Sequence, residues 1–137
     1  MDKTYKRSVF IFRRDLRLED NLGLLAALEN SEEVVPLFIF DDRQINKKEN
    51  EFFSSPAFYF MLNSLAELDE ALKNRGSQLH VAHGQPELVV KSLIENDQVE
   101  AVYVNKDYTP FSRKRDGEIN DVCKAVEVPL FRLDDVA

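Results

Sequence analysis

The amino-acid sequence predicts one α/β domain with a Rossmann-like, doubly wound sheet of five parallel strands and helices on both faces. Three observations lead to this prediction. Five short, mainly apolar runs occur along the chain, as expected of strands buried on both faces of a sheet. Between them lie segments whose apolar residues recur at helical spacing. The alternation of the two patterns is typical of parallel strands joined by right-handed crossovers, and a doubly wound sheet allows the strand order 3-2-1-4-5.

The first predicted strand is Ser8–Phe12, and it ends abruptly at a charged loop, residues 13–20. The helix after this loop carries Leu22, Leu25 and Leu28 as an apolar stripe at helical spacing. This stripe predicts an amphipathic helix. The charged loop therefore connects a buried strand to a helix.

A second buried strand is predicted at Val34–Phe40, although Pro36 removes one donor from its hydrogen-bond ladder. Residues 45–53 are polar and without clear period, so we expect a surface loop there. A long helix follows and stops before Gly76. Its apolar residues recur at three- and four-residue steps and are interpreted as the side that covers the sheet. They are Phe58, Met61, Leu62, Leu65, Leu68 and Leu72.

The second half of the chain continues the alternation. A short third strand is predicted at Gln78–Ala82, a fourth at Ala101–Val104 and a fifth at Val128–Leu133. The helices between them carry the apolar stripes Leu88, Val89, Leu93 and Ile94, and Ile119, Val122, Cys123 and Val126. Cys123 is therefore interpreted as a small buried hydrophobic residue.

Length and composition restrict the class of protein. A chain of 137 residues with 44% hydrophobic and 31% charged residues fits one compact domain. Its net charge of -7 disfavours nonspecific binding of nucleic acid, which needs a basic surface. No apolar run approaches the ~20 residues that span a bilayer, and no signal peptide is recognisable. With a single cysteine in addition, the sequence predicts a cytoplasmic protein without a membrane partner.

The usual signs of catalytic and metal chemistry are missing from the sequence. Only His80 and His83 are histidines, and no cysteine lies near them, so no metal site is predicted. No glycine-rich phosphate loop follows the first strand, and no nucleophile motif occurs. We therefore assign no catalytic residue.

Charged and polar residues gather directly after the first and fourth predicted strands. Open α/β sheets bind ligands just outside the carboxyl ends of their strands, where the strand order reverses, and these two strands are neighbours there. The residues expected to share one crevice are Arg14, Asp15, Asp107 and Tyr108. A structural alternative is that Asp15 and Asp20 only pair with the arginines and cap backbone amides. The residues alone leave both interpretations open.

Two longer stretches resemble the signatures of a known family. The first is FRRDLRLEDN at residues 12–21, followed by a leucine-rich helix, and the second is NKDYTPFSRKRD at residues 105–116. Together they resemble the amino-terminal domain of the DNA photolyase and cryptochrome family, and the resemblance supports the strand order 3-2-1-4-5. It covers essentially the whole chain, residues 1–137, and corresponds only to the first domain of the family's architecture.

The resemblance implies that the chain is the antenna-chromophore-binding domain of a light-driven DNA photolyase, a carbon-carbon lyase. In photolyases the antenna passes its excitation to FAD in a helical domain, and the flavin then splits a pyrimidine dimer. We expect that this chain stops before the helical domain, which is its implied partner and the only route to damaged DNA. The fragment by itself is not expected to be catalytic. It is expected to expose the surface that meets this partner, a surface that favours self-association.

The resemblance also indicates an antenna. Folate-binding members have an Asn-Glu pair where this sequence has Phe111 and Ser112, so a deazaflavin or flavin in the parent is favoured over folate. No cofactor is assigned with certainty to the fragment itself, and the absence of any antenna stays open as an alternative. An arginine often found near the start of the long helix is Phe58 here, which weakens the deazaflavin case. The predicted cofactor-binding residues are Arg14, Phe38, Asp41, Asp107 and Tyr108. Aromatic rings would stack on the antenna and charged groups would bond its polar edge.

Two alternatives to a photolyase remain at the level of sequence. A cryptochrome blue-light photoreceptor would share this domain but signal rather than repair. A free-standing nucleotide-binding or interaction domain of similar topology belongs to another class, and the missing phosphate loop argues against it.

Overall fold

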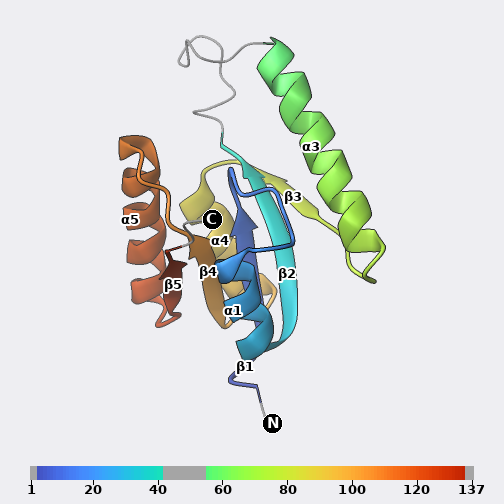
Figure 1. The fold of residues 1–137 in the computed structure, drawn as a ribbon. Coiled ribbons are helices and arrows are strands. Elements are labelled where there is room, and N and C mark those ends of the chain that lie inside the picture. The colour runs from blue at the N-terminus through green and yellow to red at the C-terminus, as the bar shows by residue number, and fades with distance from the viewer. Residues whose placement is uncertain (1–2, 42–54, 135–137) are drawn as a thin grey trace.

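The computed structural model describes residues 3–41 and 55–134, which form a five-stranded parallel sheet with helices on both faces (Figure 1). The strand order is β3-β2-β1-β4-β5, so the predicted fold class and order 3-2-1-4-5 are confirmed. In chain order the elements are β1 (Tyr5–Phe12), α1 (Leu22–Asn30), β2 (Ser31–Phe40), α3 (Ser55–Lys73), β3 (His80–His83), α4 (Pro86–Asn96), β4 (Ala101–Asn105), α5 (Pro110–Ala125) and β5 (Leu130–Leu133). The loop predicted at residues 45–53 lies outside the described residues.

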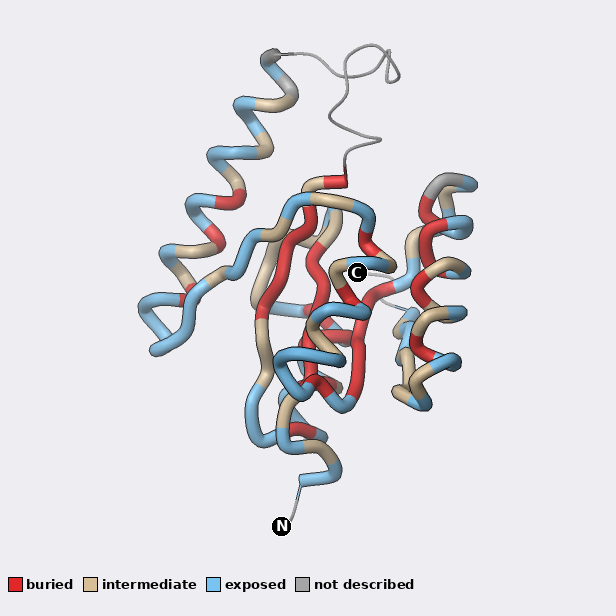
Figure 2. Tube along the Cα trace, turned by 180° about the vertical axis from the view of Figure 1, so that it is seen from behind, coloured by how far each residue is buried: buried red, intermediate tan, exposed pale blue. Residues whose placement is uncertain are grey.

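The central strand β1 divides the core into two halves. Successive side chains of a strand point to opposite faces, so Val9 and Ile11 belong to one core cluster and Phe10 and Phe12 to the other. The first cluster lies under α4 and α5 and includes Val90, Ile119 and Cys123. The second lies under α1 and α3 and includes Leu24, Leu65 and Leu68. Figure 2 shows buried residues concentrated along the sheet and exposed residues on the outer sides of the helices.

Strand boundaries differ from the prediction where the sequence is less apolar. β1 and β2 begin earlier than predicted, at Tyr5 and Ser31, because polar residues at their amino ends still pair across the sheet. Pro36 lies inside β2, yet the pairing of β2 with β3 begins only at Leu37. At Pro36 the strand β2 is therefore an edge on that side, where a missing donor is tolerated.

Helix α1 packs differently from the simplest interpretation of its leucine stripe. Leu22, Leu25 and Leu28 are 47%, 51% and 50% exposed, whereas the residues of α1 that are buried are Gly23, Leu24 and Ala27. The small residues let the helix approach the sheet closely. The stripe faces outward, with about half of each leucine exposed.

Candidate functional site

Asn105, the last residue of β4, holds the loop after β1 in place. Its side-chain amide donates to Asp15 Oδ2 at 2.5 Å and to Asn21 Oδ1 at 2.7 Å. Its side-chain oxygen accepts from the backbone N–H of Gly23 at 2.8 Å. Asn21 in turn caps α1 by accepting from the backbone N–H of Leu24 at 3.1 Å. One buried side chain therefore joins the carboxyl ends of β1 and β4 to the start of α1.

Arg13 forms a second link between the same segments. Its guanidinium donates to the carboxylate of Asp116 in α5 and to the backbone carbonyl of Asn105. Both charged side chains are nearly inaccessible, and Arg132 of β5 lies 3.4 Å from the other oxygen of Asp116. Removing either partner of a buried ion pair is strongly destabilising, because the other charge is left buried without compensation. Neither Arg13 nor Asp116 was among the predicted site residues.

Arg115, also buried, lies among the charges of this cluster. Burial, the largest cause, and the nearby charge of Arg13 lower its pKa, against the opposing effect of Asp116, Asp41 and Asp107. Asp41, which follows β2, is fully buried close to this guanidinium. The carboxyl edge of the sheet therefore contains a compact ionic core beneath its surface.

Arg14 and Asp107 meet at the surface of this edge. Arg14 Nε lies 3.6 Å from Asp107 Oδ2, and the Arg14 side chain is 78% exposed whereas that of Asp107 is 16% exposed. Asp107 also accepts from the backbone N–H of Thr109 at 3.2 Å and from Ser112 Oγ at 2.9 Å. Burial alone would raise the pKa of Asp107, but these two hydrogen bonds and the arginine charges lower it on balance. The Asp107 carboxylate is held ionised, with the free side of Arg14 open to solvent.

The structure brings Arg14 and Asp107 together. The other three predicted residues have surroundings of their own. Phe38 is buried in the α1 and α3 half of the core, edge to face with Phe40. Asp41 is buried in the ionic core. Tyr108 is exposed, and its hydroxyl donates to Asp134 Oδ1 at 2.5 Å, the main reason that its pKa is raised.

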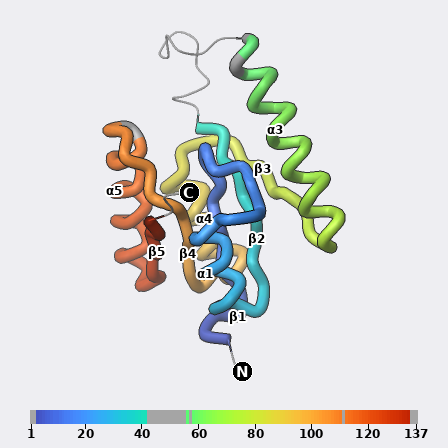
Figure 3. The backbone as a smooth tube through the Cα atoms, viewed as in Figure 1, coloured from blue at the N-terminus to red at the C-terminus, as the bar shows by residue number. Residues whose placement is uncertain are grey.

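The structural alternative holds for part of the loop after β1. Asp15 accepts from the backbone N–H of Arg13 at 2.7 Å and from Asn105, so its carboxylate braces the loop. Asp20 contributes its backbone carbonyl, which accepts from Arg17 at 3.1 Å. Figure 3 shows how the loops after β1 and β4 run at the same end of the sheet.

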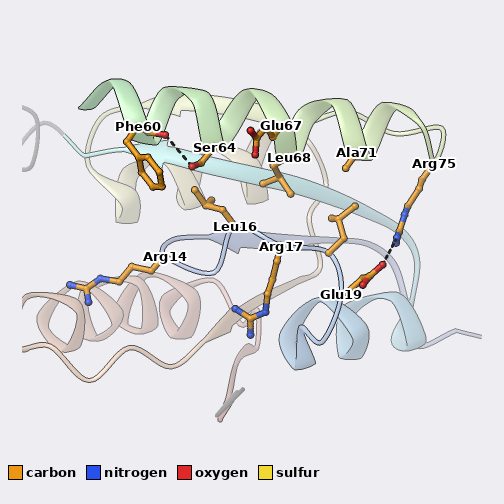
Figure 4. Close-up of a pocket in the computed structure, with 11 residues that line it drawn as sticks. Arg14, Leu16, Arg17, Glu19, Phe60, Ser64, Glu67, Leu68, Ala71 and Arg75 are labelled. Atoms are coloured by element: carbon orange, nitrogen blue, oxygen red, sulfur yellow. Dashed lines mark hydrogen bonds and ion pairs between the residues drawn. The ribbon is translucent and has the colours of Figure 1, made fainter. Parts of the chain in front are cut away.

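A groove of about 580 Å³ lies between the loop after β1 and helix α3 (Figure 4). Its apolar wall comes from Leu16 and Leu18 of the loop and from Phe60, Leu68 and Ala71 of α3. The polar lining residues are Arg14, Arg17, Glu19, Ser64, Glu67 and Arg75. Arg75 lies 4.0 Å from Glu19 at one end of the groove.

The sequence contained signals for this groove that the prediction did not use. Leu16 and Leu18 are apolar residues inside an otherwise charged loop, which suggests that they pack on something. Phe60, Ser64 and Leu68 recur every four residues, so they share one side of a helix. Of the five predicted cofactor-binding residues, Arg14 lines the groove.

Two general properties of the described residues bear on the kind of site. No helix among them is long and apolar enough to cross a bilayer. In the same residues no group of three or more His, Cys, Asp or Glu side chains is placed to hold a metal ion.

Comparisons with known proteins show that the chain is similar to photolyases and cryptochromes. A family model described as DNA photolyase matches residues 8–136. A deoxyribodipyrimidine photo-lyase of Synechococcus is 34% identical over 91% of this chain and 25% of its own length. The blue-light photoreceptor PHR2 of Arabidopsis thaliana is also 34% identical, over 92% of this chain and 29% of its own. So is cryptochrome-1 of Aedes aegypti, over 88% of this chain and 23% of its own.

A solved structure agrees with these relatives. An archaeal photolyase from Sulfolobus tokodaii, solved with two FAD molecules and with an implied novel light-harvesting cofactor, superposes with a TM-score of 0.87. The two sequences are 46% identical, and the match covers 93% of this chain and 29% of the archaeal chain. The chain therefore spans about a quarter of the length of each of these four relatives.

Proposed function

This chain belongs to the DNA photolyase family and corresponds to the amino-terminal α/β domain of photolyases and cryptochromes, and from this premise we propose that it binds the antenna chromophore of a light-driven photolyase. In the full-length parent, FAD in a carboxy-terminal helical domain would repair pyrimidine dimers with the energy that the antenna collects. The domain itself would supply binding and orientation rather than catalysis.

The observation that carries this proposal is the groove beside Arg14. Its volume of about 580 Å³ lies within the range of small-molecule sites, roughly 300–1,000 Å³. It adjoins the switch point between β1 and β4, where doubly wound sheets bind ligands. A planar chromophore would lie against the apolar wall, with its polar edge toward Arg14 and Asp107.

The five proposed cofactor-binding residues then have different roles. Arg14 and Asp107 would make polar contacts, because one is exposed and the other is held ionised beside it. Tyr108 would offer an exposed ring at the same edge. Phe38 and Asp41 are buried, so they would support the site from beneath rather than contact the ring directly.

We propose a flavin or deazaflavin rather than folate as the antenna. Ser112 stands where folate-binding members have a glutamate, and its hydroxyl already donates to Asp107 at 2.9 Å. Because Ser112 is also 3% exposed, it is poorly placed to contact a ligand. The Sulfolobus relative, solved with a second FAD, supports the choice of a flavin.

Titration of the chain with FAD, FMN, a deazaflavin and methenyltetrahydrofolate tests this proposal. We expect saturable quenching of flavin or deazaflavin fluorescence and none for the folate. Arg14→Ala should weaken binding by roughly tenfold, the effect of losing one charge-assisted hydrogen bond. Lys124→Ala, which removes an exposed basic residue near the end of α5, is the control. An absence of quenching with every flavin would contradict the proposal.

A cryptochrome photoreceptor is the second candidate, because relatives of that kind match this chain as well as photolyases do. Repair and signalling differ in what the parent does with the excited FAD. Exposing the full-length protein to dimer-containing DNA under blue light separates them: a photolyase restores the pyrimidines, and a cryptochrome leaves the dimers in place.

A further inference from the structure

Three arginines line the groove beside helix α3, although the chain as a whole is acidic. The charged lining residues are Arg14, Arg17 and Arg75 together with two carboxylates, Glu19 and Glu67. Three positive charges against two negative charges give the groove a small positive excess in a chain whose net charge is -7. A concave site with an excess of one charge attracts ligands of the other sign. The groove is therefore suited to a ligand that carries an anionic group.

Arg75 has the loosest ion pair of the three arginines. A nitrogen of its guanidinium lies 4.0 Å from Glu19 Oε1, and the two side chains are 60% and 88% exposed. Arg14 instead pairs with a mostly buried carboxylate at 3.6 Å, and Arg17 donates to the backbone carbonyl of Asp20 at 3.1 Å. An exposed ion pair contributes little free energy. Arg75 can therefore exchange Glu19 for another anion at small cost.

The two ends of the groove differ in chemistry. Phe60 and Arg14 lie at one end, and Arg75 and Glu19 lie at the other (Figure 4). Phe60 is 74% exposed, so its ring is open to a flat aromatic ligand, and aromatic rings stack favourably. A helix rises about 1.5 Å per residue, so roughly 20 Å of helix separates Phe60 from the end of α3 at Lys73. The two ends are far enough apart to contact different groups of one ligand.

Hydroxyl and carboxylate oxygens lie between these two ends. Ser64 and Glu67 follow Phe60 along α3 and line the groove before Arg75. Ser64 Oγ donates to the carbonyl of Phe60 at 3.0 Å, which leaves its oxygen as an acceptor for the hydroxyls of a sugar chain. The lining therefore changes along α3 from an aromatic ring through oxygen acceptors to a guanidinium. A flavin mononucleotide has its groups in the same order, with a fused ring, a chain of hydroxyls and a terminal phosphate.

We propose that Arg75 determines the specificity of the groove by binding the phosphate of a flavin whose ring lies at the Phe60 end. This inference rests on the proposed function, because it concerns the same groove and the same class of ligand. A guanidinium binds phosphate through paired N–H···O contacts, and a phosphate monoester carries about -1.5 to -2 charges at neutral pH. The phosphate replaces Glu19 as the anion beside Arg75. The groove then takes FMN or FAD in preference to riboflavin or to a deazaflavin without a phosphate.

Fluorescence titrations of the 137-residue chain with riboflavin, FMN and FAD test the role of Arg75. Riboflavin shares the ring and the hydroxyl chain of FMN but has no phosphate, so the ratio of the two Kd values isolates the phosphate contact. We expect FMN and FAD to bind roughly tenfold more tightly than riboflavin, the effect of one charge-assisted contact at a partly exposed site. The ratio should fall toward one at high salt, because salt screens exposed charges.

Two variants change this end of the groove in opposite directions. Arg75→Ala should raise the Kd of FMN roughly tenfold and leave that of riboflavin unchanged, which also shows that the variant is folded. Glu19→Gln removes the competing carboxylate and should lower the Kd of FMN about threefold. Lys73→Ala is the matched control, because Lys73 is a 62% exposed cation two residues before Arg75 and lies outside the set of lining residues. It should change neither Kd by more than about twofold.

Three results would overturn the role of Arg75. They are equal affinities of the unmodified chain for riboflavin and FMN, a preference for FMN that survives in Arg75→Ala, and equal losses of FMN affinity in Arg75→Ala and Lys73→Ala. In each of these results a flavin is still bound, so the proposed function would stand. If none of the three flavins bound, the proposed function and this inference would both be rejected.

Discussion

Asn105 shows how one residue organises the candidate site. Its three side-chain hydrogen bonds reach Asp15, Asn21 and Gly23, which belong to the loop after β1 and to the start of α1. A buried amide with all these partners satisfied resists displacement, since each lost bond leaves a buried polar group unpaired. The position of Arg14 therefore depends on a side chain that it does not contact.

Gly23 is a residue where no side chain fits. A Cβ there would lie 2.5 Å from Asn105 Oδ1 and 2.7 Å from Phe10 Cε1. We predict that Gly23→Ala destabilises the chain by about 2 kcal/mol through this overlap. Gly117→Ala in α5, where a Cβ meets nothing within 4 Å, should stabilise it by about 0.5–1 kcal/mol. Urea denaturation measures both, and equal effects of the two would contradict the packing described for α1.

Asp107 predicts a pH dependence. Its pKa in the folded chain is below its ordinary value of 3.8, so the stability that it contributes is complete above that value and is lost as the pH falls through the folded pKa. Asp107→Asn should cost about 1 kcal/mol at neutral pH. The difference in unfolding free energy between the two proteins should shrink as the pH falls below 3.8. If the difference in unfolding free energy between the two proteins stayed constant below pH 3.8, the Asp107 carboxylate would not be held ionised by its partners.

At the scale of elements, the sequence predicted the order of strands and helices and the strand order of the sheet. Period alone could not give the orientation of α1, because Gly23, Leu24 and Ala27 also share one side of a helix. The leucines are the more apolar set, but the small residues are the set that fits against Asn105 and Phe10. That choice depends on a contact between segments 82 residues apart, which local pattern does not contain.

The same limit explains the candidate site. Topology predicted that the loops after β1 and β4 would meet, and Arg14 and Asp107 do meet. Topology does not predict which side chains of these loops are buried. Arg13 forms the buried ion pair whereas its neighbour Arg14 is exposed, and a charged loop gives no sign of that difference.

Thr109 tests the helix that supports Asp107. Its side-chain oxygen accepts from the backbone N–H of Ser112 at 3.2 Å and so caps the start of α5. Thr109→Ala should destabilise the chain by about 1 kcal/mol, and Thr109→Ser should restore most of the loss. Chemical denaturation measures the unfolding free energy of the wild-type chain and of the two variants. If alanine is as stable as threonine, this cap does not contribute to the position of α5.

At the scale of the whole molecule, two core halves on opposite faces of one sheet predict cooperative unfolding. Cys123 reports on this property because it is fully buried between α5 and the sheet, and burial raises the pKa of its thiol to about 11. At about pH 8 the thiol should react with a labelling reagent only when the chain unfolds. The labelling rate of the native chain should therefore be roughly a thousandfold lower than that of the chain unfolded in urea.

An added thiol provides the control for this experiment. Ser92→Cys introduces a cysteine at an exposed position of α4. That variant should show one fast and one slow thiol. Fast labelling of the native wild-type chain would mean that α5 opens locally, without global unfolding.

The central claim is that the segments around Arg14 form one antenna site, and an NMR titration of the isotope-labelled chain with FAD tests it most directly. We predict shifts of the backbone amide signals in residues 13–19, in residues 105–109 and along residues 60–75, which cover most of α3 and the turn after it. These segments line the groove or its edge. Shifts confined to α4, or no shifts at saturating FAD, would contradict it.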